Sequence, residues 1–304
     1  MYQPAIDVEA ITAIDMHVHV EVDARGHASM PAPLVEAASR YFKTEGPRPE
    51  VEAIARYYRE RRMAAVVFTV DARTQLAHEP VSSSEIARAA SDHADVLIPF
   101  GSVDPRTGPA ALDLAARLIS DDGVRGFKFH PTVQGFDPSD ERYRPLWDLL
   151  ERANVPAVFH TGQTGIGAGI AGGYGLRLGW SNPMLLDPIA ASFPDLQIVM
   201  AHPSVPWQDE ALAVAVHKHN TWIDLSGWSP TYFPAQLVRY ANSLISDRVL
   251  FGTDFPLLTP DRWLRDVERT GLKPELMPRI LKDNAARLLR LAGNGSRPPR
   301  GEPR

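Results

Sequence analysis

The sequence of 304 residues contains no cysteine. This absence excludes a disulfide framework, a thiolate zinc site, an iron–sulfur cluster and a cysteine nucleophile. Histidine and carboxylate side chains must therefore hold any metal ion that the protein binds. The chain has 10 histidines with which to do so.

Long apolar runs and a basic surplus are also absent. No stretch of about 18 apolar residues occurs, so no segment is predicted to span a membrane. The N-terminal residues MYQPAIDVEA lack the basic and apolar regions of a secretion signal. The formal net charge of −5 disfavours nucleic acid or an anionic membrane as the main partner. We therefore expect a cytoplasmic protein that acts on a small molecule.

Short apolar segments alternate with longer amphipathic ones along the chain. Strand followed by helix, eight times over, predicts an α/β fold, a single-domain (β/α)8 TIM barrel. The expected strands lie at Ile11–Val20, Met63–Ala72, Val96–Pro105, Val124–Pro131, Val155–Gly162, Leu196–Ser204, Thr221–Gly227 and Arg248–Pro256. The expected helices include Val51–Arg62, Ser84–Ala94 (with Ser83 as its cap), Pro109–Ile119, Tyr143–Ala153, Pro183–Ser192, Asp209–His217, Pro234–Leu244 and Pro260–Arg269.

We expect the barrel to occupy residues 1–292. Residues 293–304 are rich in Pro, Gly and Arg and lack apolar side chains, which predicts a disordered tail. Two long connections, residues 21–50 after the first strand and residues 163–181 after the fifth, read as loops. Both would lie at the carboxyl end of the barrel, where barrel enzymes place their active sites.

Polar side chains gather where several predicted strands end. Residues two apart on a strand share a face, so His17 and His19 both point into the barrel. Any one of these histidines taken alone is more often a hydrogen-bonded core residue. A whole ring of them is better explained by a divalent cation, because buried polar groups need partners. The ring comprises His17, His19, His160, His202 and Asp254.

The motifs around this ring resemble those of the amidohydrolase superfamily. They are IDMHVH, VFHTG, MAHPS and LFGTDFP, followed by the closing segment KDNAARLL. The resemblance extends from about Ile11 to Leu291. Within this superfamily, the motifs most resemble those of the single-metal branch that contains α-amino-β-carboxymuconate-ε-semialdehyde decarboxylase. Some enzymes of the single-metal branch carry Glu in place of the first histidine, and His17 departs from that pattern.

The resemblance implies one Zn²⁺, or alternatively Mn²⁺, bound by His17, His19, His160 and Asp254. His202 would then lie beside a metal-bound water, and His202 and Asp254 would be the catalytic residues. A bound Zn²⁺ lowers the pKa of its water to about 7, which supplies hydroxide at neutral pH.

The fourth strand leaves two interpretations open. Lys128 could carry a carboxyl group that bridges two metal ions, as in two-metal relatives, or could face a substrate carboxylate beside His130. Arg177 and Trp180 in the second long loop are further candidates for substrate binding, although a solvated loop arginine is the commoner outcome. Residues with weaker indications are Asp15 behind the ligands, Trp228 as an aromatic wall, and Asp224 with Ser226 near the pocket.

The favoured function is decarboxylation of a small unsaturated or aromatic carboxylic acid. The same ligand set would also serve a hydrolase of a lactone, ester or amide, or a hydratase. A non-catalytic barrel is disfavoured because the whole ring is intact. The resemblance further suggests a homodimer. His27, His78, His93, His217 and His219 lie away from the ring and are expected to have ordinary structural or solvent roles.

Overall fold

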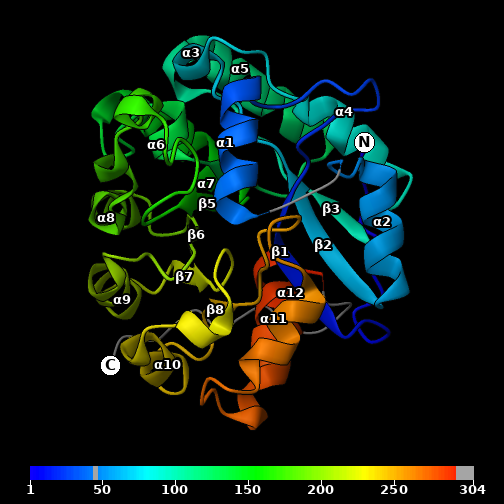
Figure 1. The fold of residues 1–304 in the computed structure, drawn as a ribbon, viewed down its shortest axis with the longest axis vertical. Helices are drawn as coiled ribbons and strands as arrows, with labels where there is room; N and C mark the ends of the chain where they lie inside the picture. Colours follow the sequence, from blue (N-terminus) through cyan, green and yellow to red (C-terminus); the bar gives the residue numbers. More distant parts are fainter. Residues whose placement is uncertain (44–46, 292–304) are drawn as a thin grey trace.

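The computed structural model describes residues 1–43 and 47–291. Within them, eight parallel strands stand at the centre and helices surround them (Figure 1). The strands are β1 (Ala13–His19), β2 (Met63–Phe68), β3 (Leu97–Pro99), β4 (Phe127–Phe129), β5 (Ala157–His160), β6 (Ile198–Ala201), β7 (Thr221–Asp224) and β8 (Val249–Leu250). Each lies inside a segment that the sequence predicts as a strand.

Two seams close the strands into a barrel. Strands β1–β2–β3 form one hydrogen-bonded group and β4 to β8 form the other. Gly101, just beyond β3, pairs with Phe127 of β4, and Val18 of β1 pairs with Phe255 beyond β8. Backbone hydrogen bonds such as His19 N–H to Phe255 O at 2.8 Å complete the second seam. The expected single (β/α)8 barrel is confirmed.

The helices predicted from amphipathic spacing are present, most of them a few residues shorter than expected. Helix α4 is capped by Ser82, whose hydroxyl accepts a hydrogen bond from Glu85 N–H, and not by Ser83 as expected. The helices are α1 (Ala32–Phe42), α2 (Val51–Glu60), α3 (Arg73–Leu76), α4 (Ser83–Ser91), α5 (Pro109–Arg117), α6 (Pro131–Gln134), α7 (Arg144–Ala153), α8 (Asp187–Ser192), α9 (Gln208–His217), α10 (Ala235–Ala241), α11 (Pro260–Val267) and α12 (Asn284–Leu289).

The prediction of a loop over residues 21–50 was wrong in one part, because it contains helix α1. Pro31 and Pro33 suggested an irregular segment. In the structure Pro31 is the N-cap residue and Pro33 lies in the first turn. Proline is tolerated there, because the first N–H groups of a helix have no partner within the helix.

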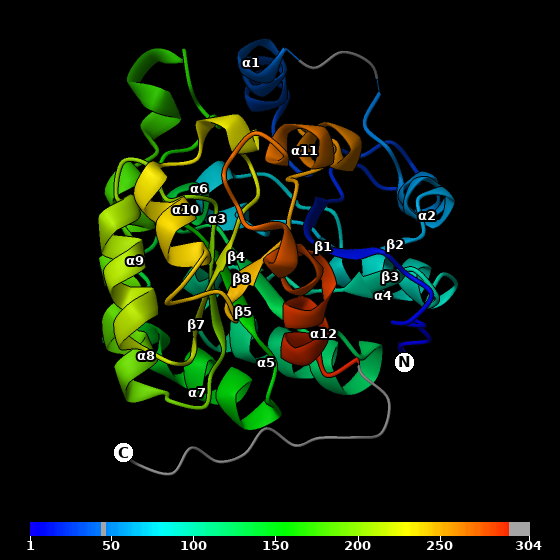
Figure 2. The same ribbon diagram turned by 90° about the horizontal axis from the view of Figure 1, so that it is seen from below.

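The second long connection, residues 163–181, contains only short 3₁₀ turns, in agreement with its lack of helical periodicity. Helix α1 projects beyond one end of the barrel, whereas α7 lies toward the opposite end (Figure 2). Gly165 of the connection fits against the Phe42 ring at the end of α1, where a Cβ would approach Phe42 to 2.4 Å. The two long segments therefore meet above the strand ends.

The core forms two layers on either side of the strands. Phe127, Phe129 and Trp147 belong to the layer between strands and helices, and Ile14 and Met16 belong to the layer inside the barrel. Alternation along β4 thus turns both phenylalanines outward and leaves Lys128 inside, as predicted. Within the described residues, no helix combines the length and apolar character needed to cross a membrane. The predicted domain end at residue 292 and the predicted tail lie outside the described residues.

Candidate metal centre and active site

Strand β1 brings two histidines to the mouth of the barrel. His17 is fully buried, and its Nδ1 lies 2.6 Å from Asp224 Oδ2. A carboxylate at this distance accepts the Nδ1 proton, which leaves Nε2 as the atom with a free lone pair. His19 lies nearer the solvent, with its Nε2 3.0 Å from Asp254 Oδ1. His17 Nε2 is 3.4 Å from the same oxygen, so both imidazoles converge on Asp254.

Asp254 follows β8 in a left-handed backbone conformation, with φ of 72°. Its N–H donates to the carbonyl of His17 at 2.9 Å, which anchors it to β1. Burial alone would raise its pKa. The hydrogen bond from His19 and the charges of His19, His202 and Lys128 lower the pKa to about 2. Asp254 is therefore an ionised carboxylate at neutral pH.

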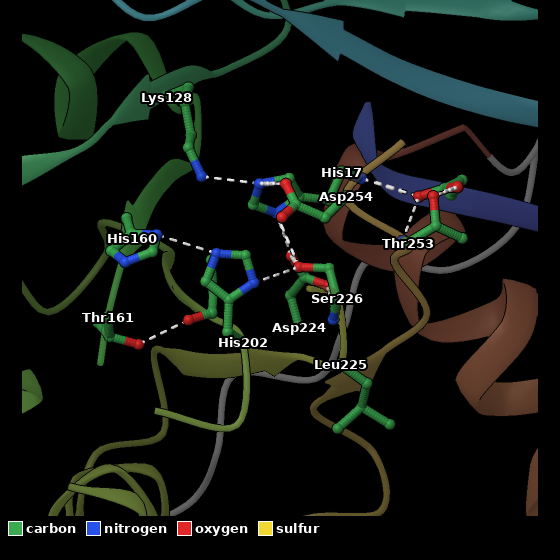
Figure 3. A network of polar contacts seen from close by, with 12 residues as sticks. His17, Lys128, His160, Thr161, His202, Asp224, Leu225, Ser226, Thr253 and Asp254 are labelled. Atoms are coloured by element: carbon green, nitrogen blue, oxygen red, sulfur yellow. Dashed lines mark hydrogen bonds and ion pairs between the residues drawn. The ribbon is translucent and has the colours of Figure 1, made fainter. Parts of the chain in front are cut away.

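His160 and His202 stand side by side at the ends of β5 and β6. His160 Nδ1 lies 3.0 Å from His202 Nε2 (Figure 3). The His160 ring also stacks on His130, with centroids 3.7 Å apart. Gly227, in the left-handed region, backs onto His202, because a Cβ there would lie 2.5 Å from Nδ1. Burial is the main cause that lowers the pKa of His202 to about 4, so its imidazole is neutral near pH 7.

Ser226 links these histidines to Asp224. Its hydroxyl donates to Asp224 Oδ2 at 2.9 Å and lies 2.9 Å from His202 Nδ1. Since a hydroxyl has one proton, Ser226 must accept the proton of His202 Nδ1. His202 Nε2 then accepts from His160 Nδ1. The remaining atom, His160 Nε2, is an unprotonated acceptor, and it is buried without a hydrogen-bond partner among the described residues.

Lys128, on β4, contacts the same cluster of side chains. It is fully buried, and its Nζ lies 2.9 Å from His17 Nε2 (Figure 3). Burial lowers its pKa to about 8, against the opposing charges of Asp254 and Asp224. Lys128 is not among the described residues that line the cavity. The structure therefore does not place it where the sequence analysis expected a substrate carboxylate.

Asp15 holds the floor of the site together. Its carboxylate accepts hydrogen bonds from Tyr58 Oη and Thr253 Oγ1, each at 2.6 Å. It also accepts from the backbone N–H groups of His17 and Thr253. Asp15 therefore fixes the backbone of β1 against the segment after β8.

A cavity of about 210 Å³ opens above the histidines. The outer part is mostly apolar, and α1 and the 163–181 connection contribute Tyr41, Phe42 and Ile166 to it. The floor is made of imidazoles and Asp254. The cavity is lined by His19, Glu21, Ser29, Met30, Tyr41, Phe42, Val70, His130, Val133, His160, Gln163, Thr164, Gly165, Ile166, His202, Gly227, Trp228, Asp254 and Leu257.

Two of the predicted substrate-binding residues lie elsewhere. Arg177 is exposed, and its guanidinium packs over the Trp180 ring at 5.2 Å. Neither is among the described lining residues. His130 does line the cavity. Its Nδ1 accepts from Val133 N–H at 3.4 Å, so Nε2 carries the proton and can donate to a ligand. Trp228 lines the cavity as the predicted aromatic wall.

The histidines predicted to have ordinary roles stay outside the cavity. His27 and His78 stack on each other at 5.2 Å, and each bonds a backbone carbonyl. Sequence reasoning missed Glu21 and Phe42 as cavity residues. Both lie in the first long connection. The only sequence signal for them was the predicted position of that connection at the carboxyl end of the barrel.

The described residues contain one group suited to a metal ion, formed by His17, His202 and Asp254. Their ligand atoms lie within 4.8 Å of one another. His19 adjoins the group through Asp254, and His160 adjoins it through His202. Two neutral imidazoles and one ionised carboxylate suit a divalent cation such as Zn²⁺ or Mn²⁺. His160 Nε2, which is buried without a hydrogen-bond partner among the described residues, offers a further lone pair to a metal ion.

Comparisons with known proteins agree with this arrangement. The amidohydrolase family profile matches residues 14–291. An uncharacterised TIM-barrel protein from Bordetella bronchiseptica is 23% identical, with a TM-score of 0.75, over 93% of this chain and 99% of its own. No curated protein matches the chain.

Two similar structures are decarboxylases. A dihydroxybenzoic acid decarboxylase from Polaromonas sp. JS666, with bound manganese and the inhibitor 2-nitroresorcinol, is 16% identical with a TM-score of 0.64. The match covers 92% of this chain and 97% of that one. The 5-carboxyvanillate decarboxylase from Sphingomonas paucimobilis is 14% identical with a TM-score of 0.59, over 92% and 99% of the two chains. At these identities the likeness shows the fold alone.

Proposed function

The chain belongs to the amidohydrolase family, and from that premise we propose that it is a metal-dependent decarboxylase. Its substrate is a small unsaturated or aromatic carboxylic acid. The observation that carries the proposal is the convergence of His17, His202 and Asp254 within 4.8 Å at the floor of a mostly apolar cavity. The two decarboxylases of like fold support the choice of reaction.

The proposed ligands of a single Zn²⁺ or Mn²⁺ are His17, His19, His160 and Asp254. His17 contributes Nε2, because Asp224 occupies Nδ1. His160 contributes the Nε2 atom that has no partner among the described residues. The bound ion would draw electron density from a substrate oxygen and lower the pKa of its water. Lys128 would have to move away from His17 Nε2 as the ion binds.

The reaction exchanges one proton for one carbon dioxide. The bond between the carboxylate carbon and the substrate skeleton breaks, its electron pair stays on the skeleton, and a proton adds to that carbon. His202 and Asp254 both line the cavity, so either can hold or deliver the proton. The mostly apolar cavity favours the neutral product over the solvated carboxylate.

Several narrower expectations remain part of this proposal. They are kinship with the semialdehyde decarboxylase branch, a homodimer, a small carboxylate as the partner and a cytoplasmic location. The kinship, the homodimer and the carboxylate partner rest on the resemblance of the sequence motifs, and the location rests on the composition of the chain.

The decisive experiment incubates the Zn²⁺- or Mn²⁺-loaded protein with a panel of carboxylic acids and lactones and measures released CO₂. We expect release with about one metal equivalent per chain. The variants His17→Ala and Asp254→Ala should lose turnover and metal. The variant His202→Ala should lose turnover and keep its metal, because His202 is proposed to move a proton.

The matched control is His93→Ala, which changes a histidine outside the cavity and should keep activity. Products that retain every carbon would replace the decarboxylase with a hydrolase or hydratase. Two metal equivalents with a carboxylated Lys128 would overturn the single-metal site.

A further inference from the structure

Apolar side chains form much of the wall of the cavity above the histidines. They are aliphatic or aromatic, and Tyr41 and Phe42 pack edge to face with centroids 4.9 Å apart. Trp228 and Leu257, which lie in the segments after β7 and β8, also line the cavity. So does Met30, which lies in the connection after β1. The neutral polar groups near the mouth are Ser29, Gln163 and Thr164.

No lysine or arginine is among the described residues that line the cavity. Lys128 is buried beneath His17, and Arg177 packs on Trp180 at the surface. The nearest arginine to the wall is Arg48, whose Nε lies 2.7 Å from Glu21 Oε2. Both side chains of this pair are largely buried. Glu21 therefore presents a carboxylate to the cavity, and the Arg48 cation is engaged behind it.

The cavity volume limits the size of the ligand. An apolar cavity of about 150 Å³ accommodates benzene. At about 210 Å³, this cavity has room for one six-membered ring with a few small substituents. Aromatic rings in its wall favour a flat ring, which packs against them edge to face or in offset stacks.

We propose that this pocket selects aromatic monocarboxylates over dicarboxylates. The inference rests on the proposed function, since it places the single carboxylate at the floor with the histidines and Asp254. The rest of the ring lies against the apolar part of the wall. The neutral hydrogen-bonding groups of the wall are His130 Nε2, which lies 3.5 Å from Thr164 Oγ1, and the side chains of Ser29 and Gln163.

A second carboxylate on the ring would lie against this largely apolar wall. It would lose its water and find no cation among the described lining residues, and an unpaired buried charge is strongly unfavourable. The Arg48 cation would not offset this charge, because it already pairs with the Glu21 carboxylate. Charge, rather than size, is therefore the expected basis of selection.

The test compares three ligands that share one ring. They are 2-hydroxybenzoate, 2-hydroxy-5-nitrobenzoate and 4-hydroxyisophthalate, whose second carboxylate has the shape of the neutral nitro group. Calorimetry with the Mn²⁺-loaded full chain measures each Kd. We expect 4-hydroxyisophthalate to bind at least about tenfold more weakly than the nitro compound.

The variant Glu21→Gln removes the carboxylate that pairs with Arg48 at nearly constant volume, so the Arg48 cation becomes available to a second carboxylate of the ligand. It should lower the ratio of the dicarboxylate Kd to the nitro-compound Kd severalfold. The control is Glu85→Gln, which removes an exposed carboxylate that pairs with Arg25 outside the cavity. It should leave the ratio of the two Kd values unchanged.

Equal or tighter binding of the dicarboxylate overturns the inference, as does failure of all three ligands to bind. Tight binding of monocarboxylates without CO₂ release from any acid would overturn the proposed decarboxylase and leave the selectivity standing. Preferential CO₂ release from dicarboxylates would overturn the selectivity and leave the decarboxylase standing.

Discussion

His17 is held on both nitrogens of its ring. Asp224 Oδ2 lies 2.6 Å from Nδ1, and Lys128 Nζ lies 2.9 Å from Nε2. The Asp224 contact fixes the tautomer and the ring orientation, which are the properties that a metal-ligating histidine needs. Asp224 is fully buried on β7, which is separated from β1 only by β8. We therefore expect Asp224, which is not a proposed metal ligand, to affect how well the site binds an ion.

The variant Asp224→Asn tests this control. Burial raises the pKa of Asp224 to about 8, so the prediction rests on its role as a hydrogen-bond acceptor and not on its charge. The amide keeps the shape but replaces one acceptor oxygen with an NH2 group, so we expect metal affinity to fall about 10- to 100-fold. Competition with a fluorescent chelator measures the change. Asp148→Asn, which alters an exposed ion pair with Arg152 on α7, should leave the affinity unchanged. Unchanged affinity in Asp224→Asn would show that Asp224 does not control the orientation of His17.

For single residues, the sequence predicts where a site side chain lies better than it predicts that side chain's hydrogen-bond partners. The two-residue spacing placed His17 and His19 on one face correctly, and the end of β8 placed Asp254. The sequence did not reveal the irregularity in β1 between Asp15 and Val18, which lets His17 follow Met16 on the inside of the barrel. The bond between His17 and Asp224 joins residues 207 apart in the chain, and no local pattern specifies such a register. Arg177 illustrates the opposite failure, because its residue type suggested anion binding while its loop conformation turned it onto Trp180.

At the scale of elements, α1 and the glycine-containing connection form one wall of the cavity. Tyr41 and Phe42 end α1, and Gly165 lies under both rings, where a Cβ would come within 2.4 Å of Phe42 and 2.8 Å of Tyr41. Real Cβ atoms do not approach so closely, so only glycine allows this contact. Because α1 was predicted as loop, the sequence could locate the wall but could not describe its surface.

Gly165→Ala should push α1 away from the connection and open the cavity. We expect kcat/KM to fall mainly through a higher KM, with metal content unchanged, because the metal ligands lie on other elements. Steady-state kinetics and metal analysis measure the two effects. The matched control is Gly179→Ala in the same connection, where a Cβ would meet nothing within 4 Å. Similar losses in both variants would refute a specific role for the contact with Phe42.

At the scale of the molecule, the site ties the barrel together. The clustered side chains come from β1, β5, β6, β7 and β8, and Lys128 joins them from β4. Eight strand–helix repeats in the sequence were enough to predict this closure. The depth of each side chain was not predictable, because it depends on strand tilt and on bridges such as Val18 with Phe255.

Metal removal should therefore lower the stability of the whole barrel. An ion that binds only the folded chain stabilises it by about 2.7 kcal/mol when its free concentration is 100 times the Kd. Without the ion, Asp254 and Lys128 remain buried with only each other and the imidazoles as partners. We expect chelation to lower Tm by several degrees and added Zn²⁺ or Mn²⁺ to restore it. Asp254→Ala supplies the control, since its Tm should not respond to metal. A wild-type Tm that is the same with and without chelator would show that hydrogen bonds alone stabilise the ring of histidines and Asp254. It would contradict the prediction that a bound metal stabilises the barrel.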